Sequence, residues 1–168
     1  MIDKLYLNLY RCFTFLFFPF SKPVIKWRIK RGKEHAIRWR EKLGESSVER
    51  PSGKLIWLHA VGLGEVLALR GLILELHKKE RNLNFLVTSS TVLSAEVFEK
   101  NCPPKTIHQF LPYDVTIYGN RFLRHWKPDL VIWSEQDVWP GLSCQASNFG
   151  IKQVLVNGKI TRESFSRR

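Results

Sequence analysis

Two short stretches place carboxylates directly after apolar runs that have the length of buried strands. Glu65 ends the stretch HAVGLGE at 59–65, and Glu135 and Asp137 stand in WSEQDVWP at 133–140. A positioned carboxylate can accept a proton from a hydroxyl, and a second one can orient a substrate or stabilise charge. The pair indicates a transfer reaction. Each carboxylate could instead only stabilise the helix that follows it. Glu65 would then complement the helix dipole, and Glu135 and Asp137 would cap the helix after them.

Glycines and hydroxyls accompany these carboxylates. Gly62 and Gly64 precede Glu65, and we expect them to allow a tight turn in which backbone N–H groups approach a ligand without Cβ interference. The stretch is no dinucleotide fingerprint, because Leu67 occupies the third glycine position, and no Gly-Lys-Ser/Thr follows to make a phosphate loop. The TSST stretch at 88–91 adds hydroxyls suited to a sugar or phosphate, and a helix N-cap.

The elements that must position these side chains alternate along the chain. Apolar runs predict strands and amphipathic segments predict helices, which together indicate a doubly wound, mainly parallel, Rossmann-like α/β sheet. Sites in such sheets lie beyond the carboxyl ends of the strands, so the carboxylates should meet at one edge. The predicted strands are 55–61, 85–90, 106–112, 130–135 and 153–157, and the predicted helices are 65–79, 91–100, 115–126 and 139–149.

The N-terminal segment combines aromatic and basic residues. Its uncharged stretch from Cys12 to Phe20 is too short to span a bilayer as a helix. Rings that enter the headgroup region beside cations that attract anionic lipid predict an interfacial anchor. The alternatives are a helix packed on the domain with a solvated basic face, and, third, a nucleic-acid patch. The expected membrane contacts are Phe13, Phe15, Phe17, Phe18, Lys22, Lys26, Trp27, Arg28, Lys30 and Arg31.

Composition limits the remaining possibilities. The 168 residues are 44% hydrophobic and suit one globular domain. The formal net charge is +12, and the first fifty residues hold 12 Lys or Arg against 5 Asp or Glu. This excess of positive charge indicates that the N-terminal part of the chain faces an anionic partner surface. Cys12, Cys102 and Cys144 match no metal-ligand spacing, so we expect a reducing compartment and no zinc site. We divide the chain into an anchor and basic segment (1–33), a connecting segment (34–54) and the Rossmann-like domain (55–168).

The order of motifs closely resembles that of the bacterial 3-deoxy-D-manno-octulosonic acid (Kdo) transferases. It is carried by IWLHAVGLGEV, LVTSSTVLSAEVFEK, HQFLPYDV, FLRHWKPDLVIWSEQDVWP and VLVNGKITRESF, and by the upstream RGKEHAIRWREKLG. The resemblance implies the N-terminal half of a B-type glycosyltransferase fold. It also implies transfer of Kdo from CMP-Kdo to a lipid A precursor at the cytoplasmic face of the inner membrane, with inversion and with no metal or cofactor.

The resemblance also implies roles for single residues. Glu65 matches the family's general base, and Glu135 matches the first Glu of its Glu-x-Glu-Leu-Trp-Pro motif, to which transition-state stabilisation is assigned. The expected substrate contacts are His59, Gly62, Gly64, Ser89, Ser90, Thr91, Asp137 and Trp139.

Several positions depart from the family pattern. Gly62 stands where Ser is usual, Gly141 stands where Asn is usual, and Arg162 and Glu163 are in swapped order. The sequence also ends before the family's second domain, which carries the CMP-Kdo site. We therefore expect the acceptor-binding half of a Kdo transferase, inactive alone, whose partners are a lipid A precursor, an anionic membrane surface, a separately encoded donor domain and no nucleic acid. The alternative is a non-enzymatic membrane-surface protein derived from that family.

Overall fold

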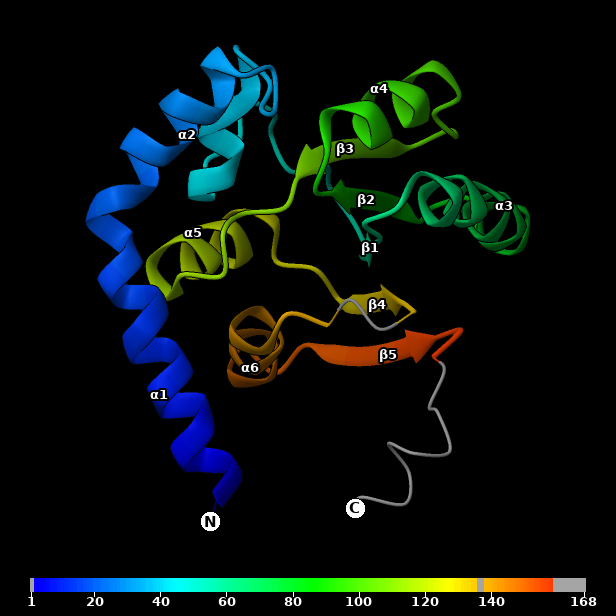
Figure 1. Cartoon of the computed structure of the whole chain (residues 1–168). Coiled ribbons are helices and arrows are strands. Elements are labelled where there is room, and N and C mark those ends of the chain that lie inside the picture. The colour runs from blue at the N-terminus through cyan, green and yellow to red at the C-terminus, as the bar shows by residue number, and fades with distance from the viewer. Residues whose placement is uncertain (1, 136–137, 159–168) are drawn as a thin grey trace.

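A parallel five-stranded sheet lies at the centre of the computed structural model, which describes residues 2–135 and 138–158 (Figure 1). The strand order is β3-β2-β1-β4-β5, and every neighbouring pair is parallel. The predicted α/β fold is confirmed, with strand and helix ends within about two residues of those expected. The elements are α1 (Ile2–Phe17), η1 (Phe18–Phe20), α2 (Ser21–Lys30), η2 (Arg38–Leu43), β1 (Leu55–His59), α3 (Leu63–Lys79), β2 (Asn84–Ser89), α4 (Val92–Lys100), β3 (Thr106–Phe110), α5 (Thr116–Trp126), β4 (Leu130–Ser134), α6 (Pro140–Asn148) and β5 (Lys152–Val156).

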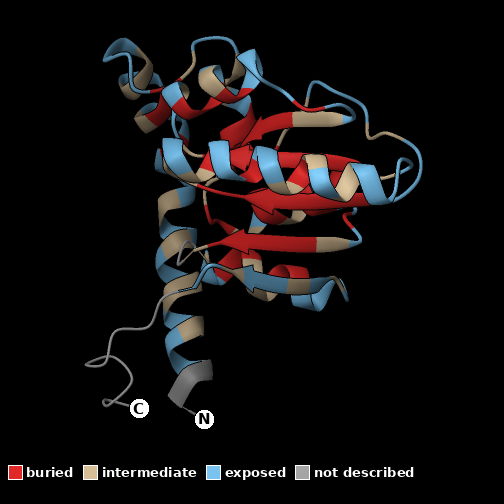
Figure 2. Ribbon diagram, turned by 90° about the vertical axis from the view of Figure 1, so that its right-hand side faces the viewer, coloured by how far each residue is buried: buried red, intermediate tan, exposed pale blue. Residues whose placement is uncertain are grey.

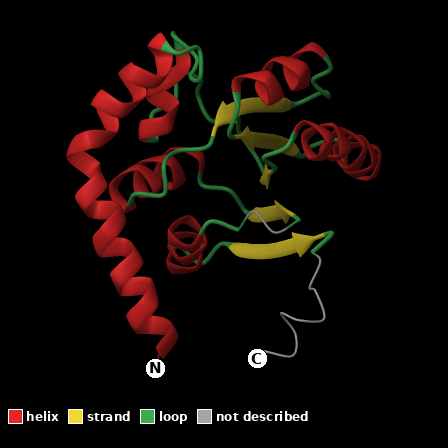
Figure 3. Cartoon of the chain, viewed as in Figure 1, coloured by secondary structure: helices red, strands yellow, loops and turns green. Residues whose placement is uncertain are grey.

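Helices cover both faces of the sheet, as Figures 1 and 3 show. On one face, Trp57 of β1 packs with Phe122 of α5 and Leu142 of α6 in one apolar cluster. On the other face, Leu58 of β1 packs with apolar side chains of α3 and with Phe98 of α4. Successive residues of β1 thus point into opposite cores, which explains why this strand reads as a continuous apolar run.

Burial distinguishes the central strands from the edge (Figure 2). Every residue of β1 and β2 is buried, whereas β5 has exposed or half-buried residues throughout. The chain leaves β1 toward β2 and β3, and α5 then carries it back to β4 and β5. The topological switch point therefore lies between β1 and β4, where doubly wound sheets bind their ligands.

The N-terminal segment runs along the carboxyl edge of the sheet. Figure 2 shows the strand arrows pointing toward the side on which α1 stands. The short helix η1, with Pro19 at its centre, separates α1 from α2, since proline interrupts the hydrogen bonds of a continuous helix. Phe17 packs edge-on against Tyr113 with ring centroids 5.5 Å apart, and Ser21 shares a hydrogen bond of 2.5 Å with Tyr118. One face of this segment is therefore docked on the domain.

The connecting segment is also part of the packed structure. Leu43 at the end of η2 is buried, and the Glu41 carboxylate accepts a hydrogen bond of 2.7 Å from the backbone N–H of Phe110 in β3. Gly44 ends η2 with φ of 73°, a left-handed conformation that favours glycine, and a Cβ there would overlap the backbone of Tyr118. These contacts tie η2 to β3 and α5, and the predicted division at residues 33 and 54 stays a prediction.

Candidate functional site

The two predicted catalytic carboxylates follow neighbouring strands. β1 and β4 are paired in parallel with His59 opposite Trp133, and Glu65 and Glu135 both come after the carboxyl ends of these strands. Ends of parallel neighbours lie at the same edge of a sheet. The structure therefore brings both residues to the switch point between β1 and β4.

Glu65 lies in the first turn of α3 and is half-buried. Its Oε2 accepts hydrogen bonds from the backbone N–H groups of Val61 (3.2 Å) and Gly62 (3.3 Å). The carboxylate therefore caps the helix, which is the structural alternative that the sequence left open. In the described part of the chain no hydrogen bond engages Oε1. One oxygen of the carboxylate holds the helix while the other can accept a proton, so the two roles are compatible.

The two glycines do not form a left-handed turn, and the predicted approach of their backbone N–H groups to a ligand stays a prediction. Gly62 has φ of −74° and ψ of 154°, and Gly64 also lies outside the left-handed region, so neither position needs the conformational freedom of glycine. A Cβ at Gly62 would lie 3.0 Å from Glu65 Oε1, and a Cβ at Gly64 would enter open space. The missing Cβ at position 62 thus leaves room for the Glu65 carboxylate.

Glu135 has an uncommon backbone conformation. Its φ of 58° is left-handed, which costs roughly 1–3 kcal/mol in a non-glycine residue. Its backbone N–H donates to Val156 O at 2.9 Å, and its Oε1 accepts from Asn157 Nδ2 at 3.1 Å, so the end of β5 holds it in place. Such strain is frequent at functional sites. Asp137, the next predicted residue, lies outside the described residues.

The expected direct contacts of His59 and Ser89 with a substrate are not available, because both residues are completely buried. The His59 Nδ1 atom lies 2.9 Å from Thr88 Oγ1, and burial lowers the pKa of His59 to about 4, so the ring is neutral. Ser89 Oγ shares a hydrogen bond of 2.9 Å with His108 Nε2. Both side chains are therefore engaged inside the fold, with Thr88 and His108.

Thr91 is the N-cap of α4, as predicted. Its Oγ1 accepts a hydrogen bond of 3.1 Å from the backbone N–H of Ser94. The Ser94 hydroxyl in turn donates to Val61 O at 3.1 Å, which fixes α4 to the loop that carries Glu65. The hydroxyl of Thr91 therefore has a structural role, and its predicted contact with substrate stays a prediction.

Ser90 and Trp139 line one cavity, which has a volume of about 150 Å³. Trp139 is the N-cap of α6 and is 37% exposed. Lys42 of η2 closes the cavity beside Ser90, whose carbonyl accepts a hydrogen bond of 3.0 Å from Nζ. The remaining lining residues are Arg28, Glu34, Leu111, Pro112 and Tyr113.

Sequence reasoning missed Lys42, Glu34 and Tyr113 as residues of this edge. Lys42 is only 4% exposed, although it stands in the charged stretch RWREKLG, where a solvated lysine would be expected. Trp39 and Leu43, the apolar residues within that charged stretch, were the signals that η2 packs on the core. The approach of η2 to the strand ends is a tertiary contact that no local pattern indicates.

The predicted membrane residues divide into two groups. Phe17 contacts Tyr113, and Arg28 Nε donates to Glu34 Oε1 at 2.8 Å, so both side chains are half-buried against the domain and their predicted contact with a membrane stays a prediction. The others are exposed, although the ring of Phe18 also contacts Tyr118 of α5 with centroids 5.5 Å apart. Arg31 stacks on Trp27 with 3.9 Å between its Cζ atom and the ring centroid. No helix among the described residues is long and apolar enough to cross a membrane.

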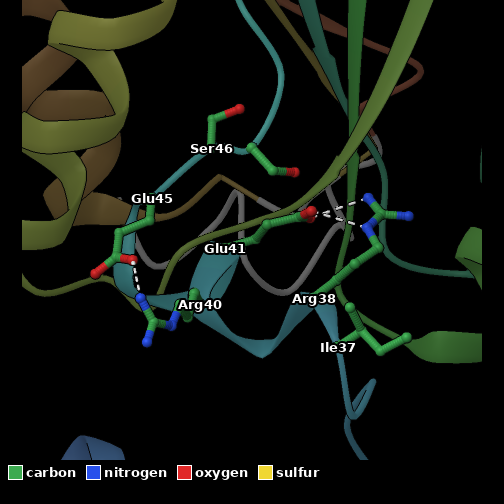
Figure 4. Close-up of a pocket in the computed structure, with 7 residues that line it drawn as sticks. Ile37, Arg38, Arg40, Glu41, Glu45 and Ser46 are labelled. Atoms are coloured by element: carbon green, nitrogen blue, oxygen red, sulfur yellow. Dashed lines mark hydrogen bonds and ion pairs between the residues drawn. The ribbon is translucent and has the colours of Figure 1, made fainter.

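A second cavity, of about 290 Å³, lies over η2 and is lined largely by charged residues (Figure 4). Arg38 donates from Nε and Nη2 to the two carboxylate oxygens of Glu41 at 2.8 and 3.0 Å, and Arg40 lies 3.7 Å from Glu45. These charges are compensated within the wall. The cluster therefore fastens η2 and offers no reactive group to a ligand.

Comparison with known proteins decides the family. A sequence model described as 3-deoxy-D-manno-octulosonic-acid transferase (kdotransferase) matches residues 37–168. The chain belongs to the Kdo transferase family. Similar proteins include a probable mitochondrial 3-deoxy-D-manno-octulosonic acid transferase of Arabidopsis thaliana, 40% identical over 160 residues. They also include the transferases of Rickettsia bellii (34% over 159 residues) and Chlamydia muridarum (28% over 165 residues).

These alignments cover 95% of this chain but only 36%, 38% and 38% of the three relatives. The chain thus spans little more than a third of their length. The matched region includes both carboxylates, η2 and the loops at the carboxyl edge.

Gly141, where the resemblance led us to expect Asn, has a defined structural setting. The backbone N–H of Gly141 donates to Asp114 Oδ2 at 2.8 Å, and Tyr10 of α1 donates to the same oxygen at 2.6 Å. A Cβ at position 141 would overlap the Asp114 carboxylate as it stands. Asp114 therefore links the N-terminal helix to the start of α6, and it occupies the space that an Asn side chain at 141 would need.

Proposed function

We propose that this chain is the acceptor-binding part of a glycosyltransferase that moves Kdo from CMP-Kdo to a lipid A precursor, and that it is inactive alone. Family membership and the placement of Glu65 and Glu135 support the proposal. The observation that carries it is the parallel pairing of β1 with β4, because this pairing puts both carboxylates at one edge.

The carboxylates have separate roles in the proposed reaction. Glu65 removes the proton from the acceptor hydroxyl, and the oxygen attacks the anomeric carbon of Kdo while CMP leaves with the bonding electron pair. Glu135 stabilises the charge that develops during transfer. The donor binds to a second domain, which a separately encoded partner or a longer chain supplies. No metal or cofactor has a step in this scheme.

Membrane association is part of the proposal, with the cytoplasmic face of the inner membrane as the location. The residues of α1 and η1 at spacings of three and four form an exposed apolar stripe of Leu5, Leu9, Phe13, Leu16 and Phe20. Lys22 and Lys26 of α2 are exposed beside it. Apolar side chains next to cations favour the surface of an anionic bilayer, where a lipid-anchored acceptor is held.

Transfer can be tested after the missing part is restored. We expect the 168-residue chain to transfer no Kdo from CMP-Kdo, because a general base contributes only about 10²- to 10⁴-fold once both substrates are held together. Fusion to the donor domain of a full-length relative should restore measurable transfer. In the fusion, Glu65→Gln should remove most activity and leave acceptor binding intact, and Glu135→Gln should lower turnover.

A matched control is Glu96→Gln on α4, an exposed carboxylate away from the strand ends. We expect it to leave transfer unchanged. Ordinary transfer by the chain alone, or a fusion in which Glu65→Gln is silent, would contradict the mechanism.

The second candidate is a non-enzymatic membrane-surface protein. The observation that favours it is the use of Glu65 Oε2 as a helix cap, which explains this residue without catalysis. That candidate predicts vesicle binding, no transfer by any fusion, and no acceptor binding at the carboxyl edge. Acceptor binding that is retained by Glu65→Gln separates the two.

A further inference from the structure

The cavity beside Ser90 and Trp139 is enclosed by charged residues from separate parts of the chain. Arg28 comes from α2, Glu34 follows α2, and Lys42 comes from η2. Two cations thus face one carboxylate in a partly enclosed space at the carboxyl ends of β2 and β3.

Among the residues that the structure describes, Lys42 has no carboxylate partner of its own. Its nearest acidic neighbours are Glu34 and Glu41, and each is already bound by an arginine at 2.8 Å, Glu34 by Arg28 and Glu41 by Arg38. Burial of an ammonium group is costly unless an anion or several hydrogen bonds compensate it. Lysine has three donors, and within the described residues only the bond to the Ser90 carbonyl uses one.

Two further groups can contact the same ligand. Arg28 uses Nε for Glu34, so within the described ranges its two terminal nitrogens keep their donors. Tyr113 lines the cavity, and burial raises the pKa of its hydroxyl to about 12, so it stays a donor at neutral pH. The cavity therefore presents an ammonium, a guanidinium and a phenol, which together suit a tetrahedral oxyanion.

We propose that Arg28, Lys42 and Tyr113 bind a phosphate ester carried by the lipid-anchored sugar acceptor, an assignment that rests on the proposed function. The volume of about 150 Å³ is several times the ~30 Å³ that a water molecule occupies in the liquid, so a phosphate group fits. Ser90 and Trp139, which the sequence predicted as substrate contacts, line the same cavity. Phosphate held there would fix the acceptor at the edge that carries Glu65.

The site also joins the anchor to the domain. Arg28 belongs to α2, whereas Lys42 and Tyr113 belong to segments packed on the sheet. A ligand that contacts all three favours the docked arrangement over an undocked one, since it binds only when they are together. Acceptor binding and docking of the anchor segment should therefore strengthen each other.

The first experiment is a calorimetric titration of the whole chain with inorganic phosphate at pH 7 and constant ionic strength. We expect saturable binding that Lys42→Gln weakens at least tenfold. Lys100→Gln, which removes one exposed charge from the end of α4, should leave binding unchanged. Glu34→Gln should tighten binding, because it removes the carboxylate from the lining, and loss of folding cannot produce such a gain. Absence of saturable binding, or equal binding by wild type and Lys42→Gln, overturns the site.

The second experiment distinguishes the sources of phosphate in the fusion that restores transfer. Lys42→Gln should raise the KM for the phosphorylated acceptor and leave the KM for a dephosphorylated acceptor unchanged. If Lys42→Gln weakens binding to vesicles that contain phosphatidic acid and changes neither KM, the site binds a lipid headgroup. That result overturns the assignment to the acceptor. Phosphate binding that depends on Lys42 in a fusion without transfer keeps the site and rejects the proposed function.

Discussion

Single side chains at the carboxyl edge combine structural and chemical roles. Glu65 caps α3 through Oε2, and its second oxygen meets no hydrogen-bond donor in the described part of the chain. Capping fixes the rotamer of the carboxylate, and a fixed carboxylate is better placed to take a proton from a bound hydroxyl. The structural and the catalytic interpretation of Glu65 therefore support each other.

Gly62 and Gly141, where the resemblance implies Ser and Asn, differ in their surroundings, so the substitutions Gly62→Ser and Gly141→Asn should have opposite effects. Gly62→Ser supplies a side-chain cap for α3, and the new Cβ meets only the flexible end of Glu65 at 3.0 Å. We expect the free energy of unfolding to rise by a few tenths of a kcal/mol, about the difference between Ser and Gly at an N-cap. Urea denaturation measures it, and a loss above about 1 kcal/mol would contradict this account.

Gly141→Asn should instead destabilise the chain. Its Cβ would overlap the Asp114 carboxylate, which can move only by giving up its bonds to Tyr10 and to the backbone at 141. Overpacking of this kind costs about 1–3 kcal/mol. The control is the same substitution in a Tyr10→Phe variant. Gly141→Asn should lower the free energy of unfolding less in that variant than in the wild type, because the hydrogen bond from Tyr10 to Asp114 is already absent. An Asn variant as stable as the wild type would show that Asp114 moves freely.

At the scale of elements, the N-terminal segment has a docked face and an exposed face. Phe17 packs on Tyr113, whereas Phe13 is 73% exposed and lies on the stripe with Leu9 and Leu16. The sequence predicted both phenylalanines as membrane contacts, because an aromatic run has no internal mark of which side a domain will cover.

Substitution of these two phenylalanines should separate docking from membrane binding. Phe13→Ser should change the free energy of unfolding by less than about 0.5 kcal/mol, since the ring is exposed. It should weaken binding to anionic vesicles about tenfold, because a buried Phe side chain contributes roughly 1.5–3 kcal/mol. Phe17→Ser should lower stability by about 1–2 kcal/mol. Cosedimentation and urea denaturation measure the two effects, and a Phe13 variant with full vesicle binding would remove the stripe from the anchor.

Sequence patterns predicted the sheet well and the site only in part. Five apolar runs between amphipathic segments define a parallel sheet because its central strands are buried on both faces, and the order of strands then places Glu65 and Glu135 at one edge. The burial of His59 and Ser89 follows from their last positions inside strands, which the pattern includes without giving their exposure. Lys42 escaped prediction because its site forms only when η2 packs on β3.

For the whole molecule, charge and burial are distributed unevenly. The exposed cations of α2 lie on the outer side of the segment, while Arg28 and Lys42 turn toward the sheet. The basic side chains near the N-terminus therefore lie in two places. Some form an exposed surface that suits anionic lipid, and others line a partly enclosed cavity that suits an anion. A salt titration should weaken vesicle binding more than it weakens ligand binding in the cavity, because screening acts mainly on exposed charges.

Two buried histidines should make the folded state sensitive to acid. Burial lowers the pKa of His59 to about 4, and burial beside Arg38 and Lys42 lowers the pKa of His108 to about 3. In the unfolded chain both rings take up protons near pH 6.5, so the unfolded state binds more protons between pH 6.5 and these lower values. Stability is therefore full above pH 6.5, is lost progressively between pH 6.5 and the folded-state pKa values near 4 and 3, and loses no more from these two groups below them.

Urea midpoints between pH 7.5 and 5, a range above most carboxylate titrations, measure this loss. We expect the midpoint to fall with acid, and His108→Gln, whose amide can still donate to Ser89, should reduce the slope of unfolding free energy against pH. His125→Gln is the matched control, because His125 is half-buried and bonds only to a backbone carbonyl of the described chain, Val48 O at 2.8 Å. A midpoint that stays constant or rises on acidification would mean that the buried rings gain protons in the folded state, and that the Arg38–His108–Ser89 contacts rearrange to accept them.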